Sequence, residues 1–167
     1  MLSRRLLLAP VLAGLLFVTA SCTNPFAPSS STPDNIAVAP EVKSSVEQFL
    51  AKLNAHDAVG AGEFFADELG FHWVEDGHAV YENRTAAITG ITNFLAGFPE
   101  TRIEGYDVKV SMLTEDAAVA SFKFTQTTAA NGQASLKSEG VMTLGMAKRD
   151  DAWKIVVGHK SANAFPH

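Results

Sequence analysis

The sequence predicts an α+β fold, because apolar residues at helical spacing come first and long alternating segments follow. Helical spacing ends near Pro99, and from Arg102 onward the pattern is that of consecutive strands. Helices followed by a run of strands are typical of an antiparallel sheet with helices over one face. We therefore expect three N-terminal helices packed on a strongly curved, mainly antiparallel sheet, with a concave mouth between the layers.

Three segments have helical spacing, over residues 42–53, 58–69 and 84–98. In the first, lysine and glutamate separate the apolar residues, so that one face of the helix is apolar. The second is short and contains two glycines, which lower its helix propensity. The third is ended by a glycine and a proline. Each segment begins after a residue that suits a helix start: Pro40, Asp57 and Asn83.

The strands are predicted from alternation and from the turns between them. Residues 71–75 and 79–82 flank Asp76-Gly77, a strong turn signal, and so form a small hairpin. Four longer strands follow, separated by polar turns: residues 102–113, 117–128, 134–148 and 152–162. In the first of these, alternate apolar residues predict one buried face: Tyr106, Val108, Val110 and Met112.

The first 22 residues have the pattern of an export signal. Arg4-Arg5 is followed by an apolar run, Leu6–Val18, which is short for a bilayer span, and then by small residues before Cys22. The segment resembles a bacterial lipoprotein signal peptide, which implies cleavage after Ser21 and diacylation of Cys22. An ordinary cleaved signal is the alternative, and the arginine pair leaves a twin-arginine export route open. The resemblance places the protein in a bacterial cell envelope, outside the cytoplasm, on the outer membrane facing the periplasm if there are two membranes.

Three parts are therefore expected: a signal peptide over residues 1–21, a tether over 22–40 and a domain over 41–167. From Thr23 to Pro40 the chain is rich in proline and serine and has few apolar anchors, which predicts an extended spacer. Without the signal the chain has eleven basic and eighteen acidic residues, a net charge of about −7. This charge gives no reason to expect binding to nucleic acid. Cys22 is the only cysteine, so the domain has no disulfide.

The last strand carries the most specific family signal. Trp153, the aliphatic run from Ile155 to Val157, His159 and Ser161 resemble the end of SnoaL-like domains, a branch of the nuclear-transport-factor-2-like superfamily. Phe65-Ala66-Asp67 and the glycine hairpin support the resemblance, which covers about Glu41 to Phe165. It implies a cone-shaped domain that forms a homodimer through the outer face of its sheet. The family includes isomerases, cyclases, dehydratases, ligand binders and association domains, so function must be argued from the site.

Candidate site residues follow from strand parity. Trp153, Ile155, Val157, His159 and Ser161 have the same parity, which puts His159 and Ser161 on the apolar side. A polar pair there needs hydrogen-bond partners. The candidates are three polar side chains or a ligand, and a satisfied structural network is the alternative to a functional site. Two aromatic side chains are candidates for the wall of a pocket, with plain packing in the core as the alternative. The polar partners are Glu139, His72 and Tyr81, and the aromatic wall is Trp73 with Tyr81.

Three functions stay open. The leading hypothesis is a lipid-anchored envelope protein whose domain binds a small, mostly apolar ligand, or a protein partner, without turnover. The second is a SnoaL-like isomerase, cyclase or hydrolase, with His159 as base, Glu139 orienting it, and Tyr81 or His72 as oxyanion donor. A structural dimerisation module is the third.

Several other kinds of site are not expected. His72, Glu75 and His78 straddle a turn and differ in strand parity, so we expect no metal. Nothing in the sequence indicates a cofactor. The isomerases of the superfamily use a general-base aspartate with a tyrosine-centred oxyanion hole. Asp67 and Asp107 are both expected to be exposed, which disfavours that chemistry here.

Overall fold

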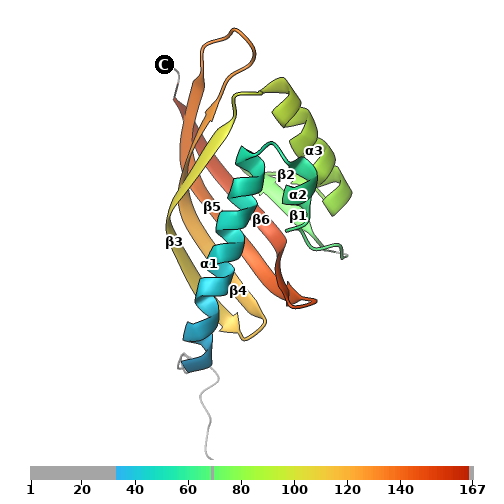
Figure 1. The fold of residues 1–167 in the computed structure, drawn as a ribbon, viewed down its shortest axis with the longest axis vertical. Helices are drawn as coiled ribbons and strands as arrows, with labels where there is room; N and C mark the ends of the chain where they lie inside the picture. Colours follow the sequence, from blue (N-terminus) through green and yellow to red (C-terminus); the bar gives the residue numbers. More distant parts are fainter. Residues whose placement is uncertain (1–32, 69, 166–167) are drawn as a thin grey trace, which may run out of the picture. The chain divides into compact units, whose positions relative to one another are not determined.

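The computed structural model describes residues 33–68 and 70–165. Its sheet has six strands in the order β2-β1-β6-β5-β4-β3. β1 and β6 are parallel, and the other neighbours are antiparallel. The long strands curve together beneath α1, as Figure 1 shows. The strand bounds are β1 His72–Glu75, β2 His78–Tyr81, β3 Arg102–Thr114, β4 Ala117–Thr128, β5 Leu136–Arg149 and β6 Ala152–Phe165. The predicted α+β class and the curved, mainly antiparallel sheet are confirmed.

The helices differ from the prediction in length and placement. α1 spans Pro33–Asn54, so it begins before Pro40 and includes it. Residues 33–40 of the predicted tether are thus helical, while residues 22–32 lie outside the described part of the chain. A proline at the first helical position is favourable, because that residue needs no amide donor. Pro40 lacks one donor within the helix, but Val38 beside it packs against the core.

The other two helices are not packed on the sheet in the way that α1 is. α2 is only Ala58–Gly62, and α3 spans Arg84–Gly97. α2 ends early because the chain then pairs with β6: the Ile155 amide donates to the Phe64 carbonyl at 2.7 Å. α3 packs mainly on α2 and β2. One long helix therefore covers the sheet, in place of the expected three.

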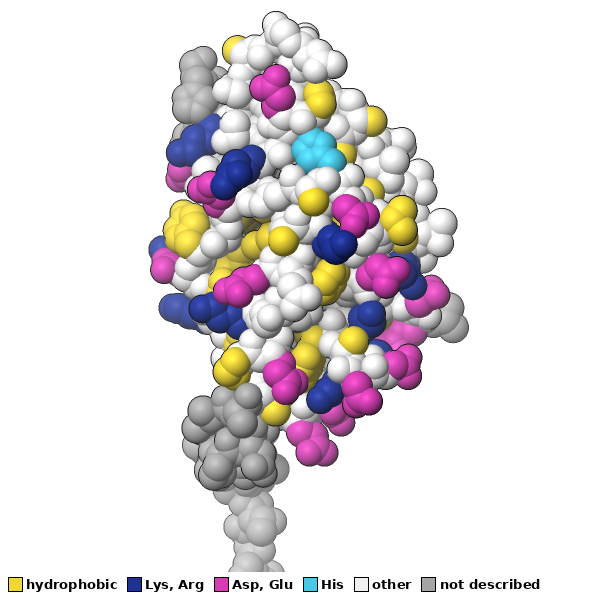
Figure 2. Space-filling model, in the orientation of Figure 1, with side chains coloured by type: hydrophobic (Ala, Val, Ile, Leu, Met, Phe, Trp, Pro, Cys, Tyr) yellow, Lys and Arg dark blue, Asp and Glu magenta, His cyan; other side chains and the backbone are white. Residues whose placement is uncertain are grey.

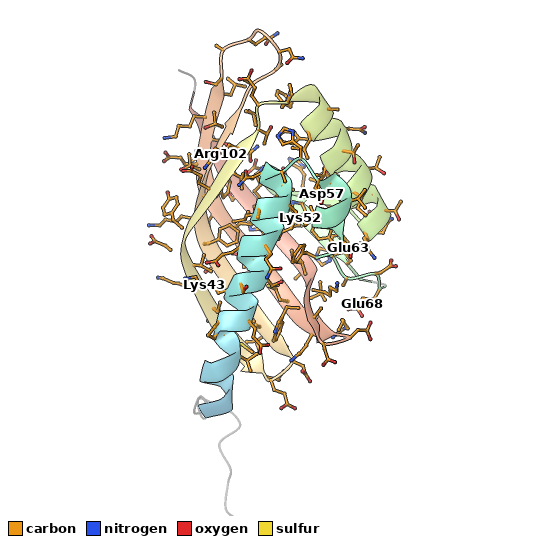
Figure 3. All side chains as sticks on the ribbon, viewed as in Figure 1. Lys43, Lys52, Asp57, Glu63, Glu68 and Arg102 are labelled. Carbon is orange, nitrogen blue, oxygen red and sulfur yellow. The ribbon has the colours of Figure 1, made fainter. Side chains whose placement is uncertain are left out.

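The predicted caps are found at both shorter helices. Asp57 Oδ1 accepts from the Gly60 amide at 2.8 Å, and Asn83 Oδ1 accepts from the Ala86 amide at 2.8 Å. Lys52 at the end of α1 donates to Asp57 Oδ2 at 2.8 Å, and Figure 3 labels both side chains. This hydrogen bond, together with the Gly60 amide, lowers the pKa of Asp57.

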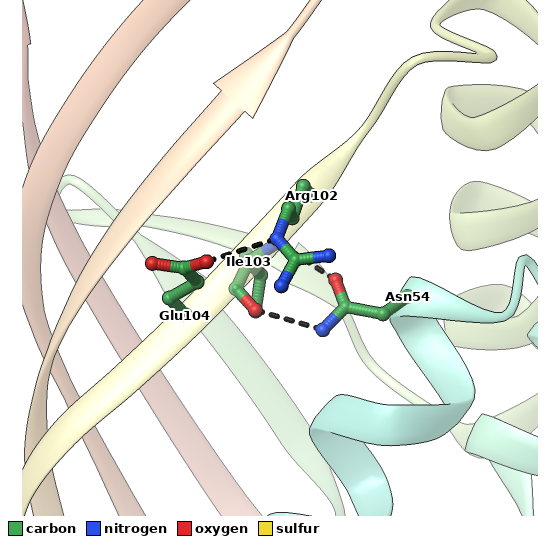
Figure 4. Close-up of polar contacts among 4 residues, drawn as sticks. All are labelled: Asn54, Arg102, Ile103 and Glu104. Atoms are coloured by element: carbon green, nitrogen blue, oxygen red, sulfur yellow. Dashed lines mark hydrogen bonds and ion pairs between the residues drawn. The ribbon is translucent and has the colours of Figure 1, made fainter.

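A side chain of α1 occupies the free edge of β3. Asn54 Nδ2 donates to the Ile103 carbonyl at 2.8 Å, and the Ile103 amide donates to Asn54 Oδ1 at 2.7 Å (Figure 4). β3 is the last strand of the sheet, so these backbone groups have no neighbouring strand to pair with. Asn54 therefore supplies the donor and the acceptor that another strand would supply.

The core lies between α1 and the inner face of the sheet. Aromatic rings pack there edge to face, with Phe49 and Phe65 at 5.5 Å and Phe65 and Trp73 at 6.0 Å between ring centroids. On the visible surface, lysines and arginines are scattered among acidic side chains without forming one basic patch (Figure 2). In the described residues, no helix is both long and apolar enough to cross a membrane.

Candidate functional site

A cavity of about 130 Å³ lies beside the aromatic core, between α1, α3 and the inner face of the sheet. Its walls are mostly apolar, and a few polar groups reach it from β1, β2, β4 and β6. The lining residues include Trp73, Glu75, Tyr81, Ile91, Gln126 and Lys160. Apolar walls with a few polar groups are typical of small-molecule sites.

Two glycines allow the aromatic side chains to lie where they do. Gly158 on β6 lies directly against the indole of Trp73, where a Cβ atom would overlap the ring. Gly90 on α3 lies against the ring of Tyr81 in the same way. Glycine is needed at both positions for this close approach. The two aromatic residues predicted for a pocket wall therefore line the cavity.

Three polar side chains form a connected group at the cavity. Trp73 Nε1 donates to Glu75 Oε1 at 2.9 Å, and Glu75 Oε2 lies 3.6 Å from Lys160 Nζ. The Lys160 side chain is only 18% exposed, and its ammonium lies 5.8 Å from the centre of the Phe124 ring. A carboxylate and an ammonium so close together leave this group with no net charge.

The phenol of Tyr81, which lines the cavity, has a raised pKa. Burial of the phenol, and then the negative charge of Glu75, raise its pKa above the usual 10.0. Both effects disfavour the phenolate. Tyr81 is therefore a neutral hydroxyl at physiological pH.

Gln126 on β4 provides a polar atom that has no partner. The residue is 5% exposed, and its Oε1 accepts no hydrogen bond from any described residue. It lies on the inner face in line with Phe122 and Phe124, opposite Ile103 of β3. A buried carbonyl oxygen without a donor is uncommon and costs about 1–3 kcal/mol.

The predicted inward orientation of His159 and Ser161 is wrong. β6 has a bulge where it pairs with β5. Gly145 of β5 pairs with Val157 and the next residue, Met146, pairs with Ile155, so Val156 has no partner of its own. The extra residue reverses the parity beyond it. Trp153 and Ile155 are buried as predicted, whereas His159 and Ser161 are exposed and Lys160 faces the cavity.

Nor does Glu139 meet His159. The partner of Glu139 across the β5–β6 ladder is Asn163, and that of His159 is Thr143. Glu139 instead forms an ion pair with Lys137 at 3.0 Å. His72 is also exposed, with Nδ1 2.9 Å from the Gly70 carbonyl oxygen. That these outer residues contact a ligand stays a prediction, but they do not line the cavity with Trp73 and Tyr81.

A bulge on β3 changes a second predicted face. The register shifts between Tyr106 and Lys109, and Asp107 there has a φ of 56°. Val108, Val110 and Met112 pack against the core as predicted, but Tyr106 is 43% exposed. Asp67 and Asp107 are both exposed, in agreement with the prediction. Within the described ranges, no three His, Cys, Asp or Glu side chains come together as metal ligands.

Three polar cavity residues were not predicted from the sequence: Glu75, Gln126 and Lys160. Gln126 had a usable signal, because it follows Phe122 and Phe124 at a spacing of two and so has the parity of the buried face. Lys160 had none, because its orientation depends on the bulge at Val156. Glu75 is placed by the hydrogen bond from Trp73 two residues earlier.

Comparison with known proteins gives the family. The family model described as a SnoaL-like domain matches residues 42–165. A comparison with curated proteins found no match.

Several solved structures have the same fold at low sequence identity. The putative scytalone dehydratase of Novosphingobium aromaticivorans is 10% identical, with a TM-score of 0.69 over 80% of this chain and 87% of that one. The hexachlorocyclohexane dehydrochlorinase LinA-type3 of Novosphingobium barchaimii is 15% identical, with a TM-score of 0.69 over 80% and 92%.

A third similar structure is described as an association domain. The putative calcium/calmodulin dependent protein kinase II association domain of Xanthomonas campestris is 19% identical, with a TM-score of 0.63 over 76% of this chain and 87% of that one. At these identities the likeness concerns the fold alone. Because the family model matches most of the chain, this protein belongs to the SnoaL-like domain family.

Proposed function

We propose that the domain binds a small, mostly apolar ligand in the cavity and does not convert it. The observation that carries this proposal is the cavity itself, about 130 Å³ of space with largely apolar walls beside the aromatic core. Protein interiors are otherwise packed to crystal density with few voids larger than a water molecule. An apolar ligand would bury its surface there and gain roughly 25 cal/mol per Å².

Binding without turnover is supported by the state of the polar groups. The Glu75 carboxylate is held on one side by the Trp73 indole at 2.9 Å and on the other by the Lys160 ammonium at 3.6 Å. A general base needs a lone pair directed at the substrate proton. Here both carboxylate oxygens already face protein groups.

The rival proposal is an enzyme, and the descriptions of two similar structures name a dehydratase and a dehydrochlorinase. The acid–base pair expected for it, His159 with Glu139, lies outside the cavity. An enzyme working in this cavity would use Glu75 or Lys160 as its base, with Tyr81 still available as the oxyanion donor. Recovery of a bound compound unchanged after long incubation supports binding, and recovery of a product supports the enzyme.

A cavity-filling variant tests the proposal. Ile91 of α3 lines the cavity, and Ile91→Phe adds a ring to that space. We expect this variant to lose the small molecules that copurify with the wild-type protein, as measured by mass spectrometry. His159→Ala is the matched control, because His159 is exposed and should leave the bound material unchanged. Equal amounts of ligand on wild type and Ile91→Phe would contradict binding in the cavity.

We also propose that the protein is exported and anchored through lipid on Cys22. The support is the order of charged start, apolar run and small residues before the cysteine. Two acyl chains give a stable membrane anchor, whereas one gives only marginal binding. Cys22→Ser should move the protein from the membrane fraction to the soluble fraction and remove the added lipid mass. A wild-type protein without lipid mass would contradict the anchor.

Association of two copies through the outer face of the sheet is the proposed quaternary structure. Tyr106 and Val141 are 43% and 47% exposed, and both belong to one cross-strand row with Lys123 and Ser161. Val141→Glu places a charge in the middle of that row and should convert a dimer to a monomer in sedimentation analysis. A wild-type monomer at high concentration would contradict the proposal, and with it the structural dimerisation module.

A further inference from the structure

The unpaired oxygen of Gln126 indicates what kind of ligand the cavity accepts. Gln126 lines the cavity, is 5% exposed, and its Oε1 has no donor among the described residues. A buried amide oxygen is normally paired, and leaving it unpaired weakens the folded state. A ligand that donates a hydrogen bond to this oxygen removes that cost, while an apolar ligand does not.

Water alone satisfies this oxygen poorly. A buried water is well held when it has about two to four polar partners. Ile103 lies opposite Gln126 in the sheet, and the cavity wall also includes the apolar side chains of Leu53 and Leu95. A molecule that combines one donor with an apolar body matches both the oxygen and these walls.

The size of the cavity limits that body to about one ring. The volume is about 130 Å³. An engineered apolar cavity of about 150 Å³ in another protein binds benzene. A single six-membered ring with one small substituent therefore matches the size of this cavity.

The charges at the cavity favour a neutral ligand. Lys160 and Glu75 are 3.6 Å apart and cancel each other. A carboxylate ligand would have to compete with Glu75 for the ammonium, and a cationic ligand would compete with Lys160 for the carboxylate. Neither unpaired charge is well accommodated beside apolar walls.

We propose that the cavity takes a small neutral ring compound with a hydroxyl group, a phenol or a cyclic alcohol, whose O–H donates to Gln126 Oε1. This inference rests on the proposed function, ligand binding in the cavity. It adds the chemical class of the ligand and the atom that selects it.

Phenol and toluene are the probes, because they have the same ring and differ in a hydroxyl or a methyl group. Each is titrated into the full-length protein, and binding is followed by the NMR signal of the Trp73 indole N–H. A hydroxyl buried without a partner would make phenol bind about tenfold or more weakly than toluene. With Gln126 as its partner, phenol is expected to bind at least as tightly as toluene.

The variant Gln126→Met removes the acceptor and keeps a similar volume. We expect phenol to bind this variant about tenfold or more weakly than it binds the wild type, and toluene to bind it as tightly or more tightly. Gln133→Met is the matched control, because Gln133 is exposed in the turn between β4 and β5 and should change neither affinity. Benzoate, which is ionised at neutral pH, should bind the wild type more weakly than phenol.

The outcomes separate this inference from the proposed function. If toluene binds the wild type at least tenfold more tightly than phenol, or if benzoate binds more tightly than phenol, the inference is overturned while cavity binding stands. If none of the probes shifts the Trp73 signal, both fail. Unchanged phenol affinity in a folded Gln126→Met variant also overturns the inference, and the wild-type comparison can overturn it even if that variant does not fold.

Discussion

Replacement of Gly158 by alanine tests the packing that positions the cavity wall. The added methyl group would overlap the six-membered ring of Trp73, with 2.9 Å to Cδ2 and shorter approaches to Cε3 and Cζ3. Gly158 lies in β6 and does not have a positive φ, so alanine meets no backbone strain there. The whole effect therefore comes from the contact between the methyl group and the indole.

The expected loss of stability has two parts. Overpacking in a tight core costs about 1–3 kcal/mol. A displaced indole also loses its hydrogen bond to the Glu75 carboxylate, now 2.9 Å, and such a bond to a charged group contributes about 1.5–3 kcal/mol. We expect Gly158→Ala to lower the free energy of unfolding by about 2.5–6 kcal/mol, a large part of the roughly 5–15 kcal/mol of a typical domain.

Urea denaturation of four proteins measures this effect: wild type, Gly158→Ala, Trp73→Leu and the double variant. Leucine at position 73 removes the ring, so the methyl group at position 158 should then cost less than about 0.5 kcal/mol. Gly97→Ala is the control, because a Cβ atom there has nothing within 4 Å, and it should be neutral or stabilise by up to about 1 kcal/mol. If Gly158→Ala is as destabilising in the Trp73→Leu background as in the wild type, the packing argument is refuted.

Two further predictions concern the edge of the sheet and the buried phenol. Asn54→Ala removes both hydrogen bonds to the Ile103 backbone, and we expect urea denaturation to show a loss of about 1–2 kcal/mol; an unchanged midpoint would contradict the role at the strand edge. In a Tyr106→Phe background Tyr81 is the only tyrosine, and its absorbance titration should have a pKa above 10.0, which Glu75→Gln lowers. Because the folded state holds the Tyr81 phenol proton more tightly than the unfolded state does, the contribution of Tyr81 to the free energy of unfolding is constant below pH 10 and is lost as the pH rises further. A Tyr81 pKa at the ordinary value would contradict the burial argument.

Regular local patterns were predicted well from the sequence. Asp57 and Asn83 cap helices, and alternation gave the four long strands to within a few residues, because these features depend on neighbours along the chain. The start of α1 was missed, because proline and serine content indicated an extended tether and the packing of Val38 on the core was not visible.

The cavity depended on information that the sequence pattern lacks. Trp73 and Tyr81 were identified as wall residues, and Gln126 was identifiable from its spacing after two buried phenylalanines. Lys160 could not be identified as a cavity residue, because the unpaired Val156 in β6 reverses which residues after it point to the inner face of the sheet.

The sequence by itself determined the fold class and the family, because both depend on composition, periodicity or a local motif, and a local motif is also the basis of the export signal that we propose before Cys22. The tertiary structure decided which polar groups share the cavity. The bulge at Val156 puts Lys160 inside and His159 outside, and the close approach allowed by Gly158 fixes Trp73 against β6. Both depend on the pairing of β6 with strands far away in sequence, since strand register and side-chain packing arise only when those strands meet.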